Sequence, residues 1–173
     1  MTIARLTARA STSASPAAVP RVRPARVRDL DAVVALRLAL LREHPDHPIY
    51  GRLRTEIDRR ARDLFAAQLR ATSETILLAE LDDVVVGILR CVESIGSPLL
   101  EPTRYAYVSS VYVIPESRRR GVLRALLAEA ERWCRARDLN EMRLHNVAGS
   151  PAAERAWDAL GFTIVEQVRL RHL

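Results

Sequence analysis

Apolar positions spaced three and four residues apart predict two helices in the first part of the chain. Residues 29–45 place such positions on one face, and Asp29 can cap the start of this helix. Residues 55–71 show the same spacing and predict a second helix. At its start, Thr55 and Asp58 form a variant of the capping box, in which the two side chains bond to backbone N–H groups.

Runs of β-branched and apolar residues predict the strands. The predicted strands cover residues 20–25, a hairpin within residues 75–94 that turns at Asp82 and Asp83, and residues 105–113, 141–147 and 162–170. Two more helices lie among these strands. One begins near residue 121 and continues to about Asp138, with apolar residues at four-residue steps. The other has Ser150 at its cap, Pro151 at its first position and Gly161 after its end.

The order of these elements is β-α-α-β-β-β-α-β-α-β, which predicts an α/β (α+β) fold with a mixed sheet covered by helices. We expect residues 20–173 to form a single domain, because no internal repeat or long linker divides them. Residues 1–19 contain arginine, serine and alanine without an acidic residue. This composition resembles an organellar transit peptide and equally fits a disordered N-terminal tail, which is our prediction.

The charge of the chain favours an anionic partner. All 27 basic residues are arginine, against 21 acidic residues, and the formal net charge is +6. Nucleic acid, a membrane surface and a phosphorylated cofactor would each suit this charge. The apolar runs are too short to span a membrane, so no membrane insertion is expected. Cys91 and Cys134 form no C-x-x-C pair, which predicts reduced, partly buried thiols and a cytoplasmic location.

The segment VYVIPESRRRGVLRALLAEAERW (residues 111–133) places three arginines and a glycine where a predicted strand gives way to a helix. The start of a helix presents unpaired backbone N–H groups and the positive end of the helix dipole, which suit an anion. Gly121 lets a ligand approach the backbone, and arginine side chains match phosphate oxygens. The glycine-rich dinucleotide motif and the P-loop are both missing. These residues alone leave two interpretations open, a diphosphate site and a solvated basic turn.

The same turn resembles the acetyl-CoA signature of the GNAT superfamily of N-acetyltransferases. That signature has a strand, a proline and then Arg/Gln-x-x-Gly-x-Gly/Ala at the start of a helix, and Arg118, Gly121 and Leu123 occupy its three marked positions. The likeness extends over residues 20–173, because VRPARVRDLDAVVAL and AAERAWDALGF resemble the family's first and last segments. The resemblance implies a GNAT-like mixed, mostly antiparallel central sheet flanked by helices. It also implies acetyl-CoA as co-substrate, with no metal.

Two positions depart from the family's pattern. Leu123 stands where the family usually has glycine or alanine, so we expect its side chain to face the core beside Leu127, away from a diphosphate. Trp157 stands where many members carry a tyrosine that protonates the leaving thiolate. An indole N–H cannot do this usefully, so water or another residue would supply the proton, or the thiolate would leave unaided.

The resemblance also implies which residues bind the cofactor. The backbone of Val111 and Val113 would bind the pantetheine arm, and the Val113 N–H would polarise the thioester carbonyl. Asn146 is a further candidate for binding the cofactor, although a turn residue that ends its strand explains it equally well. The residues expected at the cofactor are Val111, Val113, Arg118, Arg119, Arg120, Gly121, Val122, Leu123, Arg124, Ala125, Asn146, Ser150 and Trp157.

The acceptor amine must lose a proton before it attacks, so a base or a water chain is needed. The strand over residues 105–113 holds no carboxylate, and its Tyr107 is a poor base at neutral pH. Glu93 is the best carboxylate, although a solvent-facing strand residue explains it as well. The loop after the first helix lies where relatives recognise the acceptor. Its candidates are Glu43, His44, Asp46, His47 and Tyr50, which do not amount to a predicted metal site.

The resulting hypothesis is an enzyme that moves acetyl from acetyl-CoA to a primary amine of a small molecule or peptide, by direct attack in a ternary complex. One alternative is a module that binds acyl-CoA without turnover, which Trp157 and the missing strand carboxylate favour. The other is a basic nucleic-acid-binding protein, which is disfavoured because no aromatic platforms lie among the arginines. A homodimer is compatible with the sequence.

Overall fold

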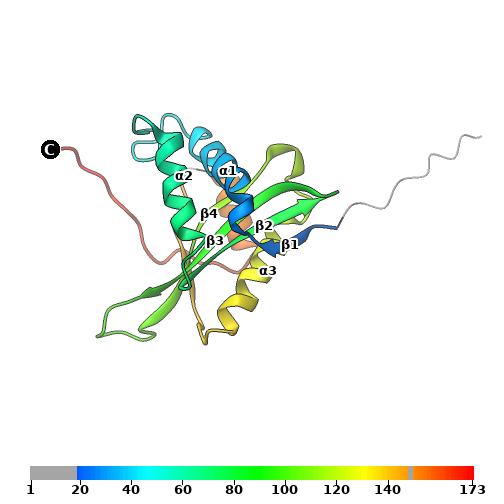
Figure 1. The fold of residues 1–173 in the computed structure, drawn as a ribbon. Coiled ribbons are helices and arrows are strands. Elements are labelled where there is room, and N and C mark those ends of the chain that lie inside the picture. The colour runs from blue at the N-terminus through cyan, green and yellow to red at the C-terminus, as the bar shows by residue number, and fades with distance from the viewer. Residues whose placement is uncertain (1–18, 148–149) are drawn as a thin grey trace, which may run out of the picture.

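The computed structural model describes residues 19–147 and 150–173, so all of the predicted N-terminal tail except Val19 lies outside the described residues. A five-stranded sheet in the order β1-β2-β3-β4-β5 forms the centre of the fold (Figure 1). The strands are β1 (Arg21–Pro24), β2 (Glu74–Leu81), β3 (Val84–Ile95), β4 (Arg104–Val113) and β5 (Met142–Leu144). The first four strands are antiparallel, and β5 joins β4 in parallel. The predicted mixed, mostly antiparallel sheet is therefore confirmed.

Helices cover both faces of this sheet, with α1 and α2 on one face and α3 on the other (Figure 1). The helices are α1 (Leu30–Arg42), α2 (Ile57–Gln68), α3 (Val122–Arg135) and α4 (Pro151–Asp158), with short 3-10 turns η1 (Val27–Asp29) and η2 (Pro115–Ser117). Within the part of the chain that the structure describes, no helix has the length and apolar character needed to cross a membrane.

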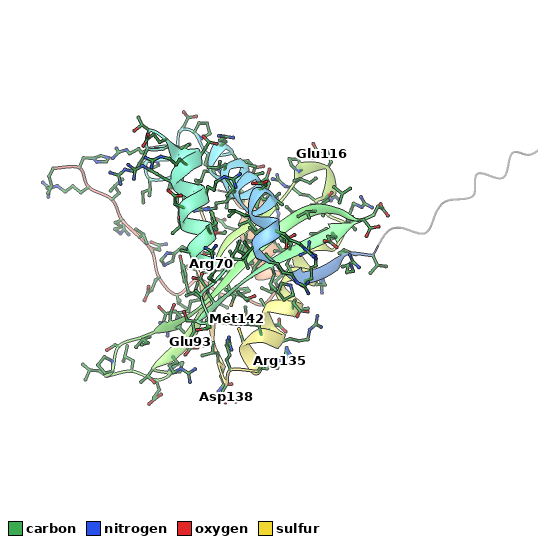
Figure 2. The ribbon with its side chains drawn as sticks, viewed as in Figure 1. Arg70, Glu93, Glu116, Arg135, Asp138 and Met142 are labelled. Atoms are coloured by element: carbon green, nitrogen blue, oxygen red, sulfur yellow. The ribbon has the colours of Figure 1, made fainter. Side chains whose placement is uncertain are left out.

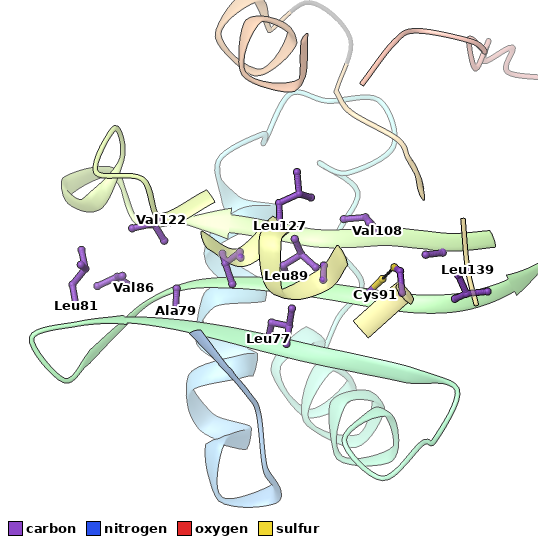
Figure 3. Close-up of a cluster of buried hydrophobic side chains, with 14 residues drawn as sticks. Leu77, Ala79, Leu81, Val86, Leu89, Cys91, Val108, Val122, Leu127 and Leu139 are labelled. Atoms are coloured by element: carbon purple, nitrogen blue, oxygen red, sulfur yellow. Dashed lines mark hydrogen bonds between the residues drawn. The ribbon is translucent and has the colours of Figure 1, made fainter. Parts of the chain in front are cut away.

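Because both faces are covered, the strands read as nearly continuous apolar runs, and alternate residues enter two separate cores. Leu77 and Leu89 pack under α3, as Figure 3 shows. Leu78 and Ile88 pack against α1 and α2 on the other face. The Sγ atoms of Cys91 and Cys134 lie 3.9 Å apart in the α3-side core, and both cysteines are free and buried, as expected for reduced thiols.

Helix α3 lies close to β3 because a glycine stands beneath it. A Cβ atom on Gly87 would come within 3.0 Å of Val122 Cγ1 and 3.3 Å of Leu126 Cδ1. Contacts this short would push the helix away from the sheet, so Gly87 fixes how near the first turn of α3 comes to the strands.

Strand β4 has a bulge on its β3 side and only a short pairing on its β5 side. The register pairs Ile88 with Tyr112 and Arg90 with Ser109, so two residues of β4, Ser110 and Val111, lie opposite one residue of β3. Ser110 has φ 54°, and this extra residue makes a β-bulge that removes backbone groups from the ladder. In addition, β5 pairs with β4 only over three residues, from Ala106 to Val108. Beyond Val108 the two strands part.

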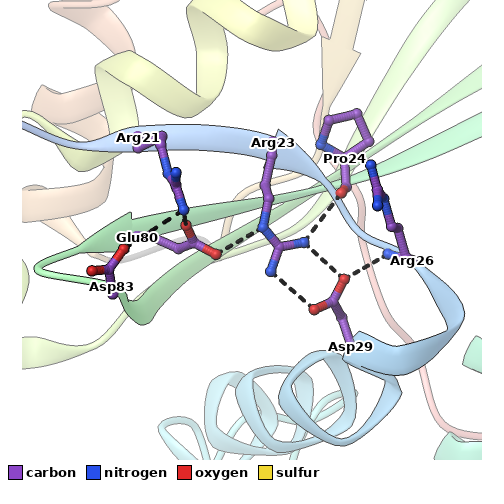
Figure 4. A network of polar contacts seen from close by, with 7 residues as sticks. All are labelled: Arg21, Arg23, Pro24, Arg26, Asp29, Glu80 and Asp83. Carbon is purple, nitrogen blue, oxygen red and sulfur yellow. Dashed lines mark hydrogen bonds and ion pairs between the residues drawn. The ribbon is translucent and has the colours of Figure 1, made fainter.

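An ion-pair network fastens β1 to β2 and to the start of α1 (Figure 4). Arg23 donates to Glu80 Oε1 at 2.7 Å and to both carboxylate oxygens of Asp29 at 2.8 and 2.9 Å, while Arg21 donates to Glu80 Oε2 at 2.7 Å. These arginines hold the pKa values of Glu80 and Asp29 below their ordinary values. Asp29 also accepts the Arg26 N–H and makes no cap bond to α1, so the predicted cap is replaced by this network.

The predicted strand over residues 162–170 is wrong, because the described chain after α4 enters no ladder. Its apolar residues Ile164, Val165 and Val168 are 70%, 83% and 72% exposed. Since β5 is only three residues long, its outer edge offers few backbone groups for pairing.

One further predicted helix cap is wrong, and another is confirmed in position only. Helix α2 begins after Glu56, which has a left-handed backbone at φ 58°, so no capping box forms at Thr55. Ser150 is the N-cap residue of α4 and Pro151 follows it, as predicted, but the Ser150 side chain makes no cap hydrogen bond.

Candidate active site

A cavity of about 1000 Å³ lies where β4 and β5 part. Its floor follows β4 from Tyr107 to Val113 and the end of β5 from Leu144 to Val147. The walls on the α3–α4 side include Arg119, Gly121, Leu123, Arg124, Ser150 and Trp157. The walls on the α1–α2 side include Arg37, Tyr50, Phe65, Gln68, Arg90 and Tyr107. The cavity can therefore receive one ligand from each face of the sheet.

The start of α3 is the anion-binding feature of the α3–α4 side. Gly121 is the N-cap residue, with φ 78°, and no side chain caps the helix. An added Cβ on Gly121 would meet no atom within 4 Å, so open space lies beside Gly121 at the start of the helix. No acidic residue occupies the first turn. Backbone N–H groups, the helix dipole and the neighbouring Arg119 and Arg124 thus fit a diphosphate.

Arg118 does not add a free charge to this cradle. Its Nε donates to the Val113 carbonyl at 2.9 Å, its Nη2 pairs with the Glu43 carboxylate, and its guanidinium lies 5.6 Å from the centre of the Tyr112 ring. The sequence assigned Arg118 to the cofactor and Glu43 to the acceptor. Both side chains line the cavity, but they pair with each other and fasten the end of α1 to the turn before α3.

Most of the other residues expected at the cofactor line the cavity, and Arg120 and Ala125 do not. The prediction for Leu123 is wrong: its half-buried side chain lines the cavity and does not enter the core beside Leu127. Successive helical residues point about 100° apart, so the burial of Val122 against β3 turns Leu123 towards the cavity.

The remaining cofactor candidates lie around α4. Trp157 lines the cavity and meets the Phe162 ring edge-to-face, with the ring centres 5.4 Å apart. Ser150 keeps its hydroxyl for a ligand because that hydroxyl does not cap the helix. Asn146 also lines the cavity, and its Nδ2 donates to the Val147 carbonyl at 3.4 Å.

Tyr107 contacts a residue that the sequence did not single out. Its hydroxyl lies 3.2 Å from His145 Nδ1, just beyond the end of β5, and both residues line the cavity. Burial is the main reason why the pKa of Tyr107 is raised above its ordinary value. The signal for His145 was strand alternation, because Arg143 pairs with Tyr107 and the second residue after it shares that face.

The structure overturns Glu93 as a candidate base. Glu93 does not line the cavity, and its carboxylate pairs with Arg104 at 2.6 Å. Figure 2 shows it near one end of the molecule, far from Glu116 in the turn before α3. The sequence favoured Glu93 over Glu101 because Glu93 ends the preceding strand, but the long β3–β4 ladder carries it away from the opening between β4 and β5.

Five residues of the loop after α1 were predicted to bind the acceptor, and two of them line the cavity without taking part in an ion pair. Tyr50 and His44 line the cavity, whereas Asp46 and His47 do not. His47 stacks on Tyr50 with ring centres 4.6 Å apart, and its Nδ1 accepts the backbone N–H groups of Ile49 and Tyr50. His47 therefore shapes the loop and presents Tyr50 to the cavity.

Three polar residues of the α1–α2 side were also missed, because each lies within an apolar helical or strand pattern. Arg90 pairs with Glu74 and donates to Ser109 Oγ at 3.3 Å. The side-chain oxygen of Gln68 is buried without a hydrogen-bond partner among the described residues. Arg37 is half-buried, and burial lowers the pKa of its guanidinium.

Residues 38–162 match the Acetyltransferase (GNAT) family. The chain belongs to this family. The match covers most of the domain and includes the turn at Gly121 and helix α4, so the family expected from the motif is confirmed.

Individual relatives agree with this membership. An aminoglycoside N(6')-acetyltransferase type 1 from Klebsiella aerogenes is 41% identical over 64 residues, which is 37% of this chain and 42% of the relative. The matched stretch therefore spans less than half of that protein.

Solved structures show the same fold. The aminoglycoside N-acetyltransferase AAC(6')-Iy in complex with CoA superposes with a TM-score of 0.74 at 21% identity, covering 92% of this chain and 99% of that one. A predicted acetyltransferase from Clostridium acetobutylicum with acetyl-CoA gives 0.71 at 18% identity, covering 88% and 96%. A GCN5-related N-acetyltransferase from Ralstonia eutropha JMP134 gives 0.72 at 19%, covering 89% and 99%.

Proposed function

We propose that this chain transfers the acetyl group of acetyl-CoA to a primary amine, with both substrates bound together. The observation that carries the proposal is the uncapped start of α3 at Gly121, which opens into a cavity running between β4 and β5. Family membership supports the reaction, and the solved relatives with CoA and acetyl-CoA support the cofactor.

The residues of the α3–α4 side fit the parts of acetyl-CoA. N–H groups of the first turn of α3 would hold the diphosphate, with Arg119 and Arg124 beside them. The pantetheine arm would lie along the backbone of Val111 and Val113, where the bulge at Ser110 has interrupted the ladder. The Val113 N–H would polarise the thioester carbonyl as a fixed donor.

The residues of the α1–α2 side would handle the amine. As the amine nitrogen bonds to the thioester carbon, one of its protons moves to the Tyr107 oxygen, and the Tyr107 proton moves to His145 Nδ1. Tyr107 suits this relay because its raised pKa keeps it protonated at neutral pH. The carbon–sulfur bond then breaks, and the CoA thiolate takes a proton from water, since the Trp157 indole is not an acid of suitable strength.

Two measurements test the proposal. Free CoA should raise the thermal midpoint in a concentration-dependent way, because it binds only the folded state. Acetyl-CoA with a panel of primary amines should release free CoA thiol. Saturable CoA binding without thiol release over the whole panel would replace the proposal with a module that senses acyl-CoA.

A further inference from the structure

The α1–α2 side of the cavity carries a net positive charge. The described residues that line the whole cavity include the arginines Arg37, Arg90, Arg118, Arg119 and Arg124. Glu43 is the one carboxylate among these described lining residues, and it pairs with Arg118. A ligand carrying several ammonium groups would therefore meet repulsion without a counter-charge.

Arg37 is the cation of this side that has no acidic partner. Arg90 is neutralised by Glu74, whereas no hydrogen bond or ion pair among the described residues involves Arg37. The charged or titratable groups near Arg37 are Tyr50, Arg90 and Tyr107, and none of them is a carboxylate. The Arg37 guanidinium remains charged at neutral pH, because arginine is the most basic side chain, even though burial lowers its pKa.

A half-buried cation without a partner is an unfavourable arrangement unless a ligand supplies the anion. Arg37 is placed for this, since it lines the same cavity as Tyr107, whose hydroxyl contacts His145 in the proposed proton relay. An anion held by Arg37 would thus lie on the side from which the amine approaches the opening between β4 and β5.

We infer that the acceptor is a primary amine that also carries a carboxylate, and that Arg37 binds this carboxylate. A planar guanidinium matches a carboxylate with two parallel hydrogen bonds, so one arginine suffices to orient the molecule. The inference rests on the proposed acetyl transfer. It separates this chain from its aminoglycoside-acetylating relatives, since aminoglycosides are polycations.

The test compares acceptors that differ only in this charge. The panel holds glycine and the standard L-amino acids that have a primary α-amine, their carboxamides, neamine and spermidine, each assayed by CoA thiol release. At least one free amino acid should exceed its carboxamide in kcat/KM by roughly 10- to 100-fold, the range for a hydrogen-bonded charge pair. Carboxamides or polycations that match or exceed every free acid would overturn the inference and leave the acetyltransferase proposal standing.

A matched pair of variants assigns the carboxylate to Arg37. Arg37→Met keeps an unbranched, flexible side chain and removes the guanidinium with its charge, and Arg28→Met removes an equal charge from an exposed turn outside the cavity. Arg37→Met should raise KM for the free acid by roughly 10- to 100-fold and leave the carboxamide within about twofold. Arg28→Met should change neither. An equal loss for acid and carboxamide in Arg37→Met would mean that Arg37 only supports the fold.

Calorimetry distinguishes a failure of the proposed acetyl transfer from a failure of carboxylate binding by Arg37. Each amino acid of the panel is titrated into CoA-loaded protein, and CoA binding itself reports that the variant is folded. If the native chain acetylates no amine, the proposed function fails, and the inference is then decided by whether an amino acid binds in an Arg37-dependent way. Absence of such binding would overturn it.

Discussion

Placing a carboxylate at the start of α3 should strongly weaken cofactor binding, and the chain offers a matched control for it. Gly121 and Gly161 both have a left-handed backbone, with φ 78° and 85°, and an added Cβ at either meets no atom within 4 Å. Only Gly121 lines the cavity. Gly121→Glu and Gly161→Glu therefore share the same backbone penalty and differ in their position relative to the ligand.

The two effects can be sized separately. A side chain in the left-handed region costs about 1–2 kcal/mol, which for a chain of this length lowers the thermal midpoint by about 2–8 °C in each variant. A glutamate about 5 Å from one diphosphate charge adds about 3 kcal/mol of repulsion at an effective dielectric constant of about 20. This corresponds to CoA binding on the order of 100-fold weaker, and it applies to Gly121→Glu alone.

Titration calorimetry with CoA measures the affinity, and thermal unfolding without ligand measures the shared penalty. Gly121→Gln has the same backbone cost and similar bulk without the charge, so it should bind CoA more tightly than Gly121→Glu. If Gly121→Glu and Gly161→Glu bound CoA equally well, the start of α3 would not be the diphosphate site.

Three further predictions concern the proton relay, the leaving thiolate and acid stability. Tyr107→Phe and His145→Gln should each lower kcat by roughly 100-fold with unchanged CoA affinity, and the double variant should lose little more, because the two groups act in one relay. Additive losses in steady-state assays would contradict the relay. Trp157→Tyr should have a higher kcat than Trp157→Phe, since only tyrosine can protonate the thiolate; equal values would mean that water already does so. Arg23→Met should lose about 1–3 kcal/mol at pH 7 in urea unfolding, because Glu80 and Asp29 lose a partner. Their pKa values are lowered in the folded state, so the stabilisation is present above about pH 4–5 and disappears as the pH falls through the folded values; the native chain and the variant should therefore converge once the pH is below those lowered values.

The sequence predicted the strands and helices wherever burial of the element produces a regular pattern of apolar residues. Leu77 and Leu78 enter opposite cores, and the continuous apolar run of β2 already indicated a strand buried on both faces. The predicted strand at the C-terminus failed for the converse reason. Its alternation of Ile164 and other apolar residues had no neighbouring edge long enough to pair with, and a local pattern cannot reveal the length of a partner strand.

The sequence predicted site residues that a local backbone pattern defines. It could not predict those that depend on which strands or which charges pair in the fold. Gly121 could be found because a helix start, a glycine and an anion form one local pattern. Glu93 was the carboxylate that the sequence favoured as the base, but in the fold it pairs with Arg104 and does not line the cavity. His145 became a candidate only when the parallel register of β4 and β5 brought it to Tyr107.

The arginines of the cavity show why pairing decides the role of a charge. A chain whose basic residues are all arginine gives no compositional hint about which guanidinium binds a ligand. In the fold, Glu43 neutralises the charge of Arg118, and Glu74 neutralises that of Arg90. These two ion pairs stabilise the walls of the cavity. The electrostatic potential inside it is therefore set mainly by the arginines that have no acidic partner. On the α1–α2 side that residue is Arg37. The cofactor and the carboxylate of the acceptor are therefore expected to bind on opposite faces of the sheet, with the reacting amine and thioester brought together at the gap between β4 and β5.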